Sequence, residues 1–166
     1  QGAKGVEFMI ETIDQVMATS DNRYLCFSLG PEEYGIPLVT VKEVIGVIDI
    51  TPVPFVPPHF LGIMNLRGKV LTAIDLRKKL NVPNHESDTT KAAEERAIII
   101  CDLTPLTIGI LVDSVNAVIT PTEQEITAKP SIETSKNFDY VEKVFRTNER
   151  FILLLNLKKV LELQVI

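Results

Sequence analysis

The sequence predicts a mainly β protein built from two similar small barrels, preceded by one amphipathic helix. Two observations carry this prediction. Short apolar runs alternate with glycine, proline and asparagine along most of the chain, and one part of the chain matches another. A chain of 166 residues can form one compact domain, or two small lobes that share a core. Closure into barrels removes the exposed edges that short strands otherwise present.

The first expected element is a helix over residues 6–18. Its apolar side chains recur at spacings of three and four, which is the periodicity of one face of an amphipathic helix. Acidic residues interrupt the segment, so it lacks the pattern of a secretory signal. We expect the apolar stripe to pack on a barrel or on a partner.

From residue 23 onward the pattern changes to short strands joined by tight turns. The predicted strands are 23–29, 33–37, 41–49, 63–66 and 69–75 in the first half, and 96–102, 107–112, 115–120, 140–146 and 150–156 in the second. Short helices are expected at 76–80 and 157–161, and a helical turn is expected from the capping box Thr120-Pro-Thr-Glu. The proline-rich run from Thr51 predicts an extended crossing segment, and residues 81–95 predict a polar surface connection.

Two internal matches indicate a duplication. The segment that begins at Gly35 aligns with the segment that begins at Gly109, with Gly, Ile and Val positions in common. The hairpin and helix around Asp75 align in the same way with those around Asn156. Each half therefore contains the same series of strands, a hairpin and a short helix, which predicts two copies of one supersecondary unit.

The duplication also predicts how the chain is divided. Residues 1–22 form a tail and helix, residues 23–163 form one domain of two lobes, and residues 164–166 form the C-terminal end. The expected lobes are about 23–80, with a contribution from 150–163, and 96–149.

Composition argues against several classes of function. A net charge of −5 and a pI near 5.1 argue against a nucleic-acid backbone as the main partner. Only 6% of the residues are aromatic, so stacking platforms for single strands are scarce. No apolar stretch approaches the ~20 residues of a membrane span. Cys26 and Cys101 lie in apolar runs and are interpreted as core residues, not as a redox or zinc pair.

The sequence contains no constellation typical of catalysis, so we expect no enzyme activity, no cofactor and no metal. It has no Gly-x-Ser-x-Gly elbow and no glycine-rich phosphate loop. Its two histidines, His59 and His85, have no second ligand at metal-binding spacing. The basic run from Arg77 lies where cations favour the C-terminal end of a short helix.

Four motifs stand in order along the chain: Phe27-Ser-Leu-Gly-Pro-Glu-Glu-Tyr-Gly-Ile-Pro, Val41-Lys-Glu-Val-Ile, Gly62-Ile-Met-Asn-Leu-Arg-Gly-Lys-Val-Leu-Thr-Ala-Ile-Asp-Leu-Arg and Gly109-Ile-Leu-Val-Asp-Ser-Val. Together they resemble the motifs of the CheW-type coupling proteins of bacterial chemotaxis. The likeness covers about Arg23 to Leu163, nearly the whole chain apart from the N-terminal helix.

The resemblance implies two intertwined five-stranded SH3-like β-barrels, in agreement with the duplication. It also implies a non-catalytic adaptor that couples chemoreceptors to the histidine kinase CheA, whose regulatory domain shares the fold. Receptor hairpin tips would dock in the groove between the barrels, and the regulatory domain would pack barrel against barrel. Such a protein is cytoplasmic, is recruited to membrane receptor arrays and does not insert into the membrane. The residues that contact the kinase stay unassigned.

Carried over position by position, the resemblance implies four receptor-binding residues. Val41 and Glu43 fall in the receptor-side strand, and Gly62 and Arg67 fall in the hairpin. Arg67 is the principal candidate because its fork of donors can hold a carboxylate or carbonyl group of a partner. The alternative is a solvated charge at a hairpin tip, with Gly68 supplying the positive φ. For Glu43 the alternatives are a pair with a partner cation and a solvated strand residue.

Other residues near these motifs have structural interpretations. Alternation along the strand predicts Val41 and Ile45 on one side and Val44 on the other. We interpret Asp75 and Asp113 first as carboxylates that stabilise turns and second as interface residues.

Two departures from the family pattern lie in the second half. Asn156 stands where many members carry Asp, although Asn can form similar local hydrogen bonds. Glu142-Lys143 stands where a glycine is expected before the last hairpin, which puts the second turn and its contact in question.

Several readings stay open beside the chemotaxis coupler. Within the family they are the adaptor part of a CheV-like protein and a coupler of a pilus-motility pathway. Because the chain ends at Ile166 with no receiver-like βα alternation, we expect a free-standing coupler. From another class, the alternative is a small-barrel module that binds nucleic acid or a small ligand.

Overall fold

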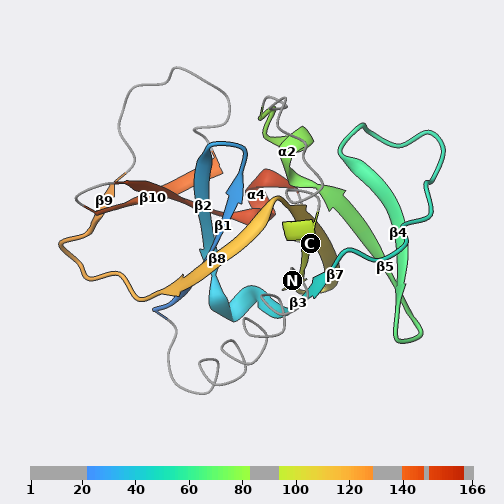
Figure 1. The fold of residues 1–166 in the computed structure, drawn as a ribbon, viewed down its shortest axis with the longest axis horizontal. Helices are drawn as coiled ribbons and strands as arrows, with labels where there is room; N and C mark the ends of the chain where they lie inside the picture. Colours follow the sequence, from blue (N-terminus) through green and yellow to red (C-terminus); the bar gives the residue numbers. More distant parts are fainter. Residues whose placement is uncertain (1–21, 83–93, 129–139, 148–149, 163–166) are drawn as a thin grey trace.

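The computed structural model describes residues 22–82, 94–128, 140–147 and 150–162 (Figure 1). The predicted helix at 6–18 and most of the connection at 81–95 lie outside these residues. The strands are β1 (Tyr24–Leu29), β2 (Glu32–Pro37), β3 (Val41–Gly46), β4 (Phe60–Leu66), β5 (Lys69–Asp75), β6 (Ala97–Leu103), β7 (Leu106–Val112), β8 (Ser114–Ile119), β9 (Ile126–Ala128), β10 (Val141–Arg146) and β11 (Phe151–Leu155). The helices are η1 (Leu38–Thr40), α2 (Leu76–Lys79) and α4 (Leu157–Val160). No helix in this part of the chain is long and apolar enough to span a membrane.

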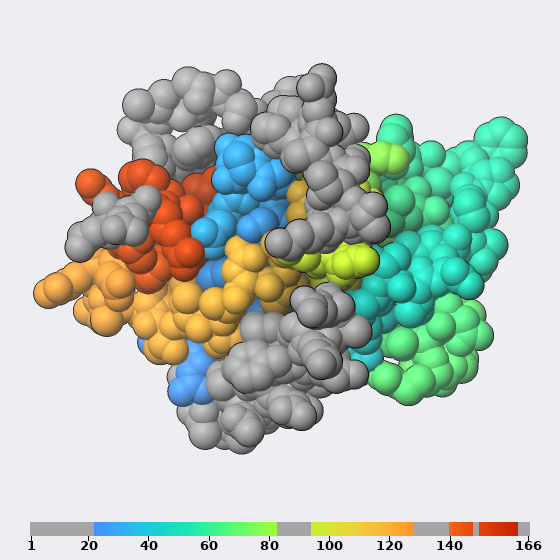
Figure 2. Space-filling model, in the orientation of Figure 1, coloured from blue at the N-terminus to red at the C-terminus, as the bar shows by residue number. Residues whose placement is uncertain are grey.

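The strands form two sheets that lie side by side. A six-stranded sheet has the order β8-β1-β2-β11-β10-β9, and a five-stranded sheet has the order β3-β6-β7-β5-β4. Neighbours are antiparallel except for the parallel pairs β2–β11 and β5–β7. Strands β9 and β10 lie at one end of the molecule, and β4 and β5 at the other (Figure 1). The surface shows the same division, with the cyan and green segments gathered on the right of Figure 2. The predicted mainly β fold is confirmed.

The two sheets repeat one arrangement of strands. Taken across each sheet, β8, β1, β2, β11 and β10 correspond in order to β3, β6, β7, β5 and β4. The first hairpin of each half, β1–β2 or β6–β7, pairs with the later strands of the other half, so the halves are intertwined. The expected lobes at 23–80, 150–163 and 96–149 stay a prediction, and each sheet draws strands from both halves.

The buried side chains form three clusters. The largest draws residues from both sheets and from the three short helices, and so lies between the barrels. Each barrel also encloses a smaller cluster of its own. Strand β6 serves two of the clusters, because Ile99 and Cys101 face the shared core while Ile98 and Ile100 face the five-stranded barrel. A strand buried on both faces explains the unbroken apolar run in this part of the sequence.

Both cysteines lie in these cores, as predicted. Cys26 belongs to the core of the six-stranded barrel and Cys101 to the shared core, and neither side chain reaches solvent. Burial raises the pKa of the Cys26 thiol to about 12 and also raises the pKa of Cys101. Thiols held in the neutral form are poor nucleophiles, so both residues act as small core side chains.

The aligned glycines occupy equivalent places in the two barrels. A Cβ on Gly35 would lie 2.8 Å from Cδ2 of Leu154, in the core of the six-stranded barrel. A Cβ on Gly109 would overlap Cε of Met64 and lie 2.8 Å from Cγ2 of Ile98, in the core of the five-stranded barrel. The space inside each barrel therefore requires glycine at the same point, which accounts for this feature of the duplication.

The aligned polar residues Asp75 and Asn156 cap the two short helices. A carboxylate oxygen of Asp75 accepts hydrogen bonds from the backbone N–H groups of Arg77 and Lys78, at 3.0 and 3.3 Å. The side-chain oxygen of Asn156 accepts one from the backbone N–H of Lys159 at 3.3 Å. The interpretation of Asp75 as a turn-stabilising carboxylate is confirmed, and Asn156 substitutes for aspartate in the same role.

The predicted helical turn from Thr120 and Glu123 is wrong. The capping pair is instead Thr122 and Glu125, where the backbone N–H and the hydroxyl of Thr122 donate to the Glu125 carboxylate at 3.1 and 2.8 Å. These two hydrogen bonds lower the pKa of Glu125. They close a turn that leads directly into β9, a three-residue strand that the sequence did not predict. Pairing with β10 outweighs the local helical signal.

Two strand limits differ from the prediction by three residues, and the others agree to within one. Strand β3 ends at Gly46 instead of residue 49, and β4 begins at Phe60 instead of residue 63. The extended crossing segment between them contacts the sheet at an isolated bridge from Thr51 to Ile63. This bridge is the counterpart of the β9–β10 pairing in the other barrel, because Ile63 aligns with Val144.

Asp113 joins the two sheets. It is the single residue between β7 of the five-stranded sheet and β8 of the six-stranded sheet. Its carboxylate accepts a 2.7 Å hydrogen bond from the backbone N–H of Gly30, in the β1–β2 turn. It also forms an ion pair with Arg77 of α2, whose Nη1 lies 3.1 Å from a carboxylate oxygen. The carboxylate therefore stabilises a turn, as predicted, and also fastens one barrel to the other.

We expect Asp113→Ala to lower the free energy of unfolding by about 1–3 kcal/mol, because it removes the acceptor of the Gly30 N–H and the partner of Arg77. Asp113→Asn keeps one acceptor and should lose less. Urea unfolding measures both, with Asp49→Ala as the control, since Asp49 is exposed and makes no hydrogen bond or ion pair with a described residue. Equal unfolding free energies for Asp113→Ala and Asp49→Ala would contradict this role.

Candidate functional site

The β4–β5 hairpin presents Arg67 at its tip. Arg67 and Gly68 both have positive φ, 51° and 86°, and together they form the turn. Two-residue turns of this kind match the twist of the flanking strands. The side chain of Asn65 supports the turn by accepting a 2.9 Å hydrogen bond from the backbone N–H of Gly68. The predicted positive φ at Gly68 is confirmed, and Arg67 itself adopts a positive φ as well.

A β-bulge in β3 directs Glu43 outward. The pairing of β3 with β6 shifts register between Val41 and Glu43, which leaves Lys42 as the extra residue. As a result Val41 and Val44 both face the shared core, and Ile45 packs against the core of the five-stranded barrel. The predicted alternation, with Val41 and Ile45 on the same side, is therefore wrong, because a bulge changes the phase of the strand.

Glu43 and Arg67 form an ion pair. Nη2 of Arg67 donates to both carboxylate oxygens of Glu43, at 2.6 and 2.5 Å. The two residues belong to opposite edges of the five-stranded sheet, since β3 and β4 are its outer strands. The pair therefore connects the two edges of the barrel. The Arg67 side chain is 69% exposed and that of Glu43 is 23% exposed, so solvent screens the attraction and its contribution to stability is small.

The pair stands over a hollow of about 390 Å³, which we call the hairpin mouth. The hairpin extends at the lower right of the molecule in Figure 2. Eight residues line the mouth: Lys42, Glu43, Leu66, Arg67, Lys69, Leu71, Ile100 and Thr107. Apolar side chains form its inner part and charged ones form its rim, a combination typical of protein-binding surfaces.

The four residues implied by the resemblance take different places. Glu43 and Arg67 meet in the hairpin mouth. Val41 is fully buried in the shared core and offers no side-chain surface. Gly62 has φ 144°, and a Cβ there would overlap the backbone carbonyl of Thr51. Val41 and Gly62 thus shape the barrel on which the other two stand, because one fills the core and the other admits the crossing segment.

Lys42 and Lys69 are rim residues that sequence reasoning missed. Lys42 is the extra residue of the bulge and lines the mouth beside Glu43. Lys69 follows the turn and stands at the start of β5. Its position next to Gly68, directly after the turn of a hairpin that the sequence predicts, was the signal that could have identified it.

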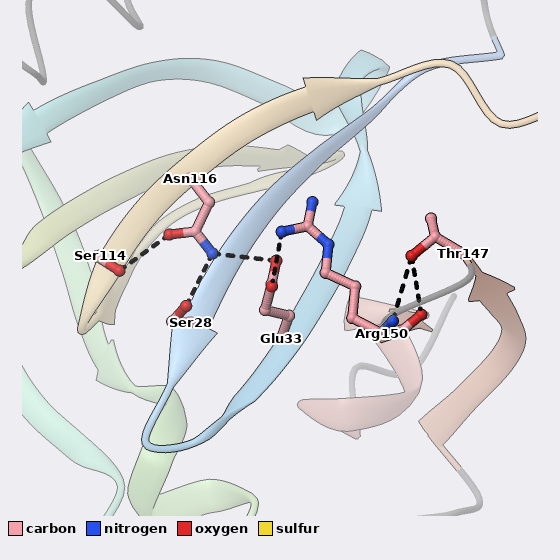
Figure 3. A network of polar contacts seen from close by, with 6 residues as sticks. All are labelled: Ser28, Glu33, Ser114, Asn116, Thr147 and Arg150. Carbon is pink, nitrogen blue, oxygen red and sulfur yellow. Dashed lines mark hydrogen bonds and ion pairs between the residues drawn. The ribbon is translucent and has the colours of Figure 1, made fainter.

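A network of polar contacts occupies the equivalent part of the six-stranded barrel (Figure 3). Nη1 of Arg150 lies 3.1 Å from a carboxylate oxygen of Glu33. Nδ2 of Asn116 donates to Oγ of Ser28 at 2.8 Å and to Glu33 at 3.3 Å, and its Oδ1 accepts a 3.0 Å hydrogen bond from Ser114. The network joins β8, β1, β2 and the start of β11.

The hairpin mouth and this polar network, which we call the second hairpin site, are related by the duplication. Asn116 is the extra residue of a bulge in β8, as Lys42 is in β3. The second hairpin needs no glycine where Lys143 stands, because β9 pairs regularly with Lys143 through Ala128. Its counterpart Gly62 is instead crossed closely by Thr51. This difference explains the second departure from the family pattern.

The described residues contain no cluster of three or more His, Cys, Asp or Glu side chains able to hold a metal ion. His59 is half-buried and packs against Phe60, with ring centroids 5.0 Å apart. Desolvation and the nearby charge of Lys79 lower the pKa of His59.

The hairpin mouth offers an exposed guanidinium, two lysines and an apolar floor, which are means of binding another molecule.

Comparisons with known proteins agree in family and fold. The model of the CheW-like domain matches residues 23–165. The chemotaxis protein CheW of Bacillus subtilis is 32% identical over 140 residues, covering 84% of this chain and 86% of that protein. The chemotaxis protein CheW of Klebsiella aerogenes is 30% identical over 143 residues, covering 86% and 83%. The crystal structure of the scaffolding protein TtCheW from Thermoanaerobacter tengcongensis superposes with a TM-score of 0.74 at 29% identity, covering 87% of this chain and 95% of that one.

We expect Gly62→Ala to lower the free energy of unfolding by about 2–4 kcal/mol, because φ is 144° and the added methyl group would overlap the Thr51 carbonyl. Gly46→Ala is the matched control, since a Cβ at Gly46 meets no atom within 4 Å. Thermal and urea unfolding of the two variants measure the difference. Equal stability of the two variants would show that the crossing segment does not constrain Gly62.

Proposed function

Since the chain belongs to the CheW-like domain family and is a chemotaxis scaffold of two SH3-like β-barrels, we propose that it couples chemoreceptors to the histidine kinase CheA. The cytoplasmic hairpin tip of a receptor docks at the hairpin mouth and along the groove between the barrels. The regulatory domain of the kinase packs against a barrel elsewhere on the surface. The protein works in the cytoplasm, where it is recruited to receptor arrays.

The observation that carries this proposal is the exposed Arg67 held in place by Glu43. A guanidinium that is both exposed and positioned loses little conformational freedom when it binds, and arginine is enriched among residues that dominate binding energy. Its place on a rim above apolar side chains supports a protein partner over a small molecule.

The proposed mechanism is one of proximity. A scaffold that binds receptor and kinase through separate surfaces holds them together, so their contact becomes effectively intramolecular. No covalent step is required of the scaffold. Its contribution is the relative orientation of two surfaces, and the Asp113 junction between the barrels supports a fixed orientation.

We expect Arg67→Glu to weaken binding of the receptor tip by about tenfold or more, because it removes the donor and places two carboxylates at the rim. Binding of the CheA regulatory domain should stay unchanged. Co-purification and titration of the full chain with both partners from the same organism measure the two affinities.

Arg146→Glu is the control, because Arg146 is exposed on the other barrel, where it lies over the ring of Phe151. Arg67→Lys should show an intermediate loss, since lysine keeps the charge but not the fork. Receptor binding by Arg67→Glu at the level of the unchanged protein would count against the hairpin mouth as the docking site.

A further inference from the structure

We infer that the hairpin mouth takes an acidic, amphipathic segment of the receptor, whose carboxylates pair with Lys42 and Lys69 as well as with Arg67. This inference rests on the proposed function and adds to it the chemistry of the docked segment. It follows from the charges of the rim, from the unused donors of Arg67 and from a comparison with the second hairpin site in the six-stranded barrel.

The rim carries more positive than negative charge. Its lining holds three cations, Lys42, Arg67 and Lys69, and one carboxylate, Glu43. That carboxylate already forms the ion pair with Arg67. Lys42 and Lys69 are exposed, and neither forms an ion pair with any described residue. In a chain of net charge −5, an excess of cations at one hollow favours an acidic partner there.

One further carboxylate lies near the rim. Asp102 has a pKa lowered mainly by hydrogen bonds from the hydroxyl and the backbone N–H of Thr104, at 2.9 and 3.0 Å, with smaller effects from Lys42 and Lys158. Its carboxylate is thus committed to the β6–β7 turn. It offsets part of the field of Lys42 but forms no ion pair with it.

Arg67 has donors left over. Only Nη2 contacts Glu43, and Nε and Nη1 make no hydrogen bond with any residue that the structure describes. A guanidinium carries five N–H groups, so most of them stay available to an incoming carboxylate. The ion pair with Glu43 therefore positions Arg67 without using it up.

The floor of the mouth fits the apolar side of such a segment. Leu66, Leu71 and Ile100 line it. A segment with carboxylates on one face and aliphatic side chains on the other would cover this apolar surface while its charges meet the rim. That arrangement is the usual one for a polar rim around an apolar centre.

The second hairpin site, in the six-stranded barrel, provides a comparison within the same molecule. Its bulge residue is Asn116 in place of Lys42, and its hairpin cation is Arg150 in place of Lys69. Arg150 is paired with Glu33 (Figure 3). The five-stranded barrel carries Thr107 at the position that aligns with Glu33. The cation that follows the hairpin turn is thus paired with Glu33 in one barrel, while its equivalent Lys69 forms no ion pair with a described residue in the other.

The test is a titration of the full chain with the receptor tip fragment at low and high ionic strength. The double variant Lys42→Glu/Lys69→Glu should bind about tenfold or more weakly at roughly 50 mM salt, and the difference should shrink at roughly 500 mM. Lys42→Gln/Lys69→Gln should fall between this variant and the unchanged protein, because it removes attraction without adding repulsion.

The matched control is Lys78→Glu/Lys143→Glu, which makes the same change of charge at two exposed lysines outside the mouth. It should bind within about twofold of the unchanged protein. Binding of the kinase regulatory domain, measured on every variant, reports that the chain is folded. The two single variants, Lys42→Glu and Lys69→Glu, supply the result if the double variant does not fold.

The outcomes separate this inference from the proposal beneath it. Loss of receptor binding by Arg67→Glu, with both lysine variants binding normally at every salt concentration, would leave the docking site in place and overturn its acidic partner. Equal losses in the control and in the lysine variants would overturn it too, because net charge alone would explain them. Failure of the unchanged protein to bind the receptor tip at any salt concentration would instead remove the proposed function.

Discussion

The exchange of first hairpins between the two halves of the chain is the constraint on which the rest of the structure depends. Because β1–β2 and β6–β7 each complete the sheet of the other half, neither half can form a barrel alone. Strands β1 and β6 are buried on both faces, where alternate residues fill a barrel and the shared core. The apolar surface that would stabilise one barrel is thus continuous with that of the other, and we expect the domain to unfold as one cooperative unit.

The same exchange determines where a binding surface can form. In the five-stranded sheet the outer strands β3 and β4 come from one half, and the hairpin of the other half lies between them. The bulge at Lys42 and the turn at Arg67 then bring the two edges together at one mouth. A surface built from both edges of a barrel is held by the core beneath it, so its rim residues are well positioned although the ion pair is weak.

Local chemistry was visible in the sequence, and long-range pairing was not. The caps Asp75 and Asn156, the turn at Gly68 and most strands follow from short patterns. The phase of Val44 does not, because the bulge that sets it depends on the pairing of β3 with β6, more than fifty residues away. Strand β9 was missed because three residues form too short a run to show alternation, and it exists only through its pairing with β10. Glu43 and Arg67 were singled out by likeness to a family, and their contact required the closed barrel.

The duplication places equivalent polar positions in the two barrels, but the contacts made at these positions differ. Each copy of the unit supplies a bulge and a hairpin cation. In the six-stranded barrel these groups are satisfied by neighbours, with Asn116 on Ser28 and Arg150 on Glu33. Polar groups paired internally have little to gain from a partner, because an existing contact must be broken first. In the five-stranded barrel Thr107 replaces the carboxylate, and Lys69 forms no ion pair with any described residue. A few differences between related positions therefore separate a barrel rim whose polar groups pair with one another from a rim whose lysines form no ion pair with the described residues.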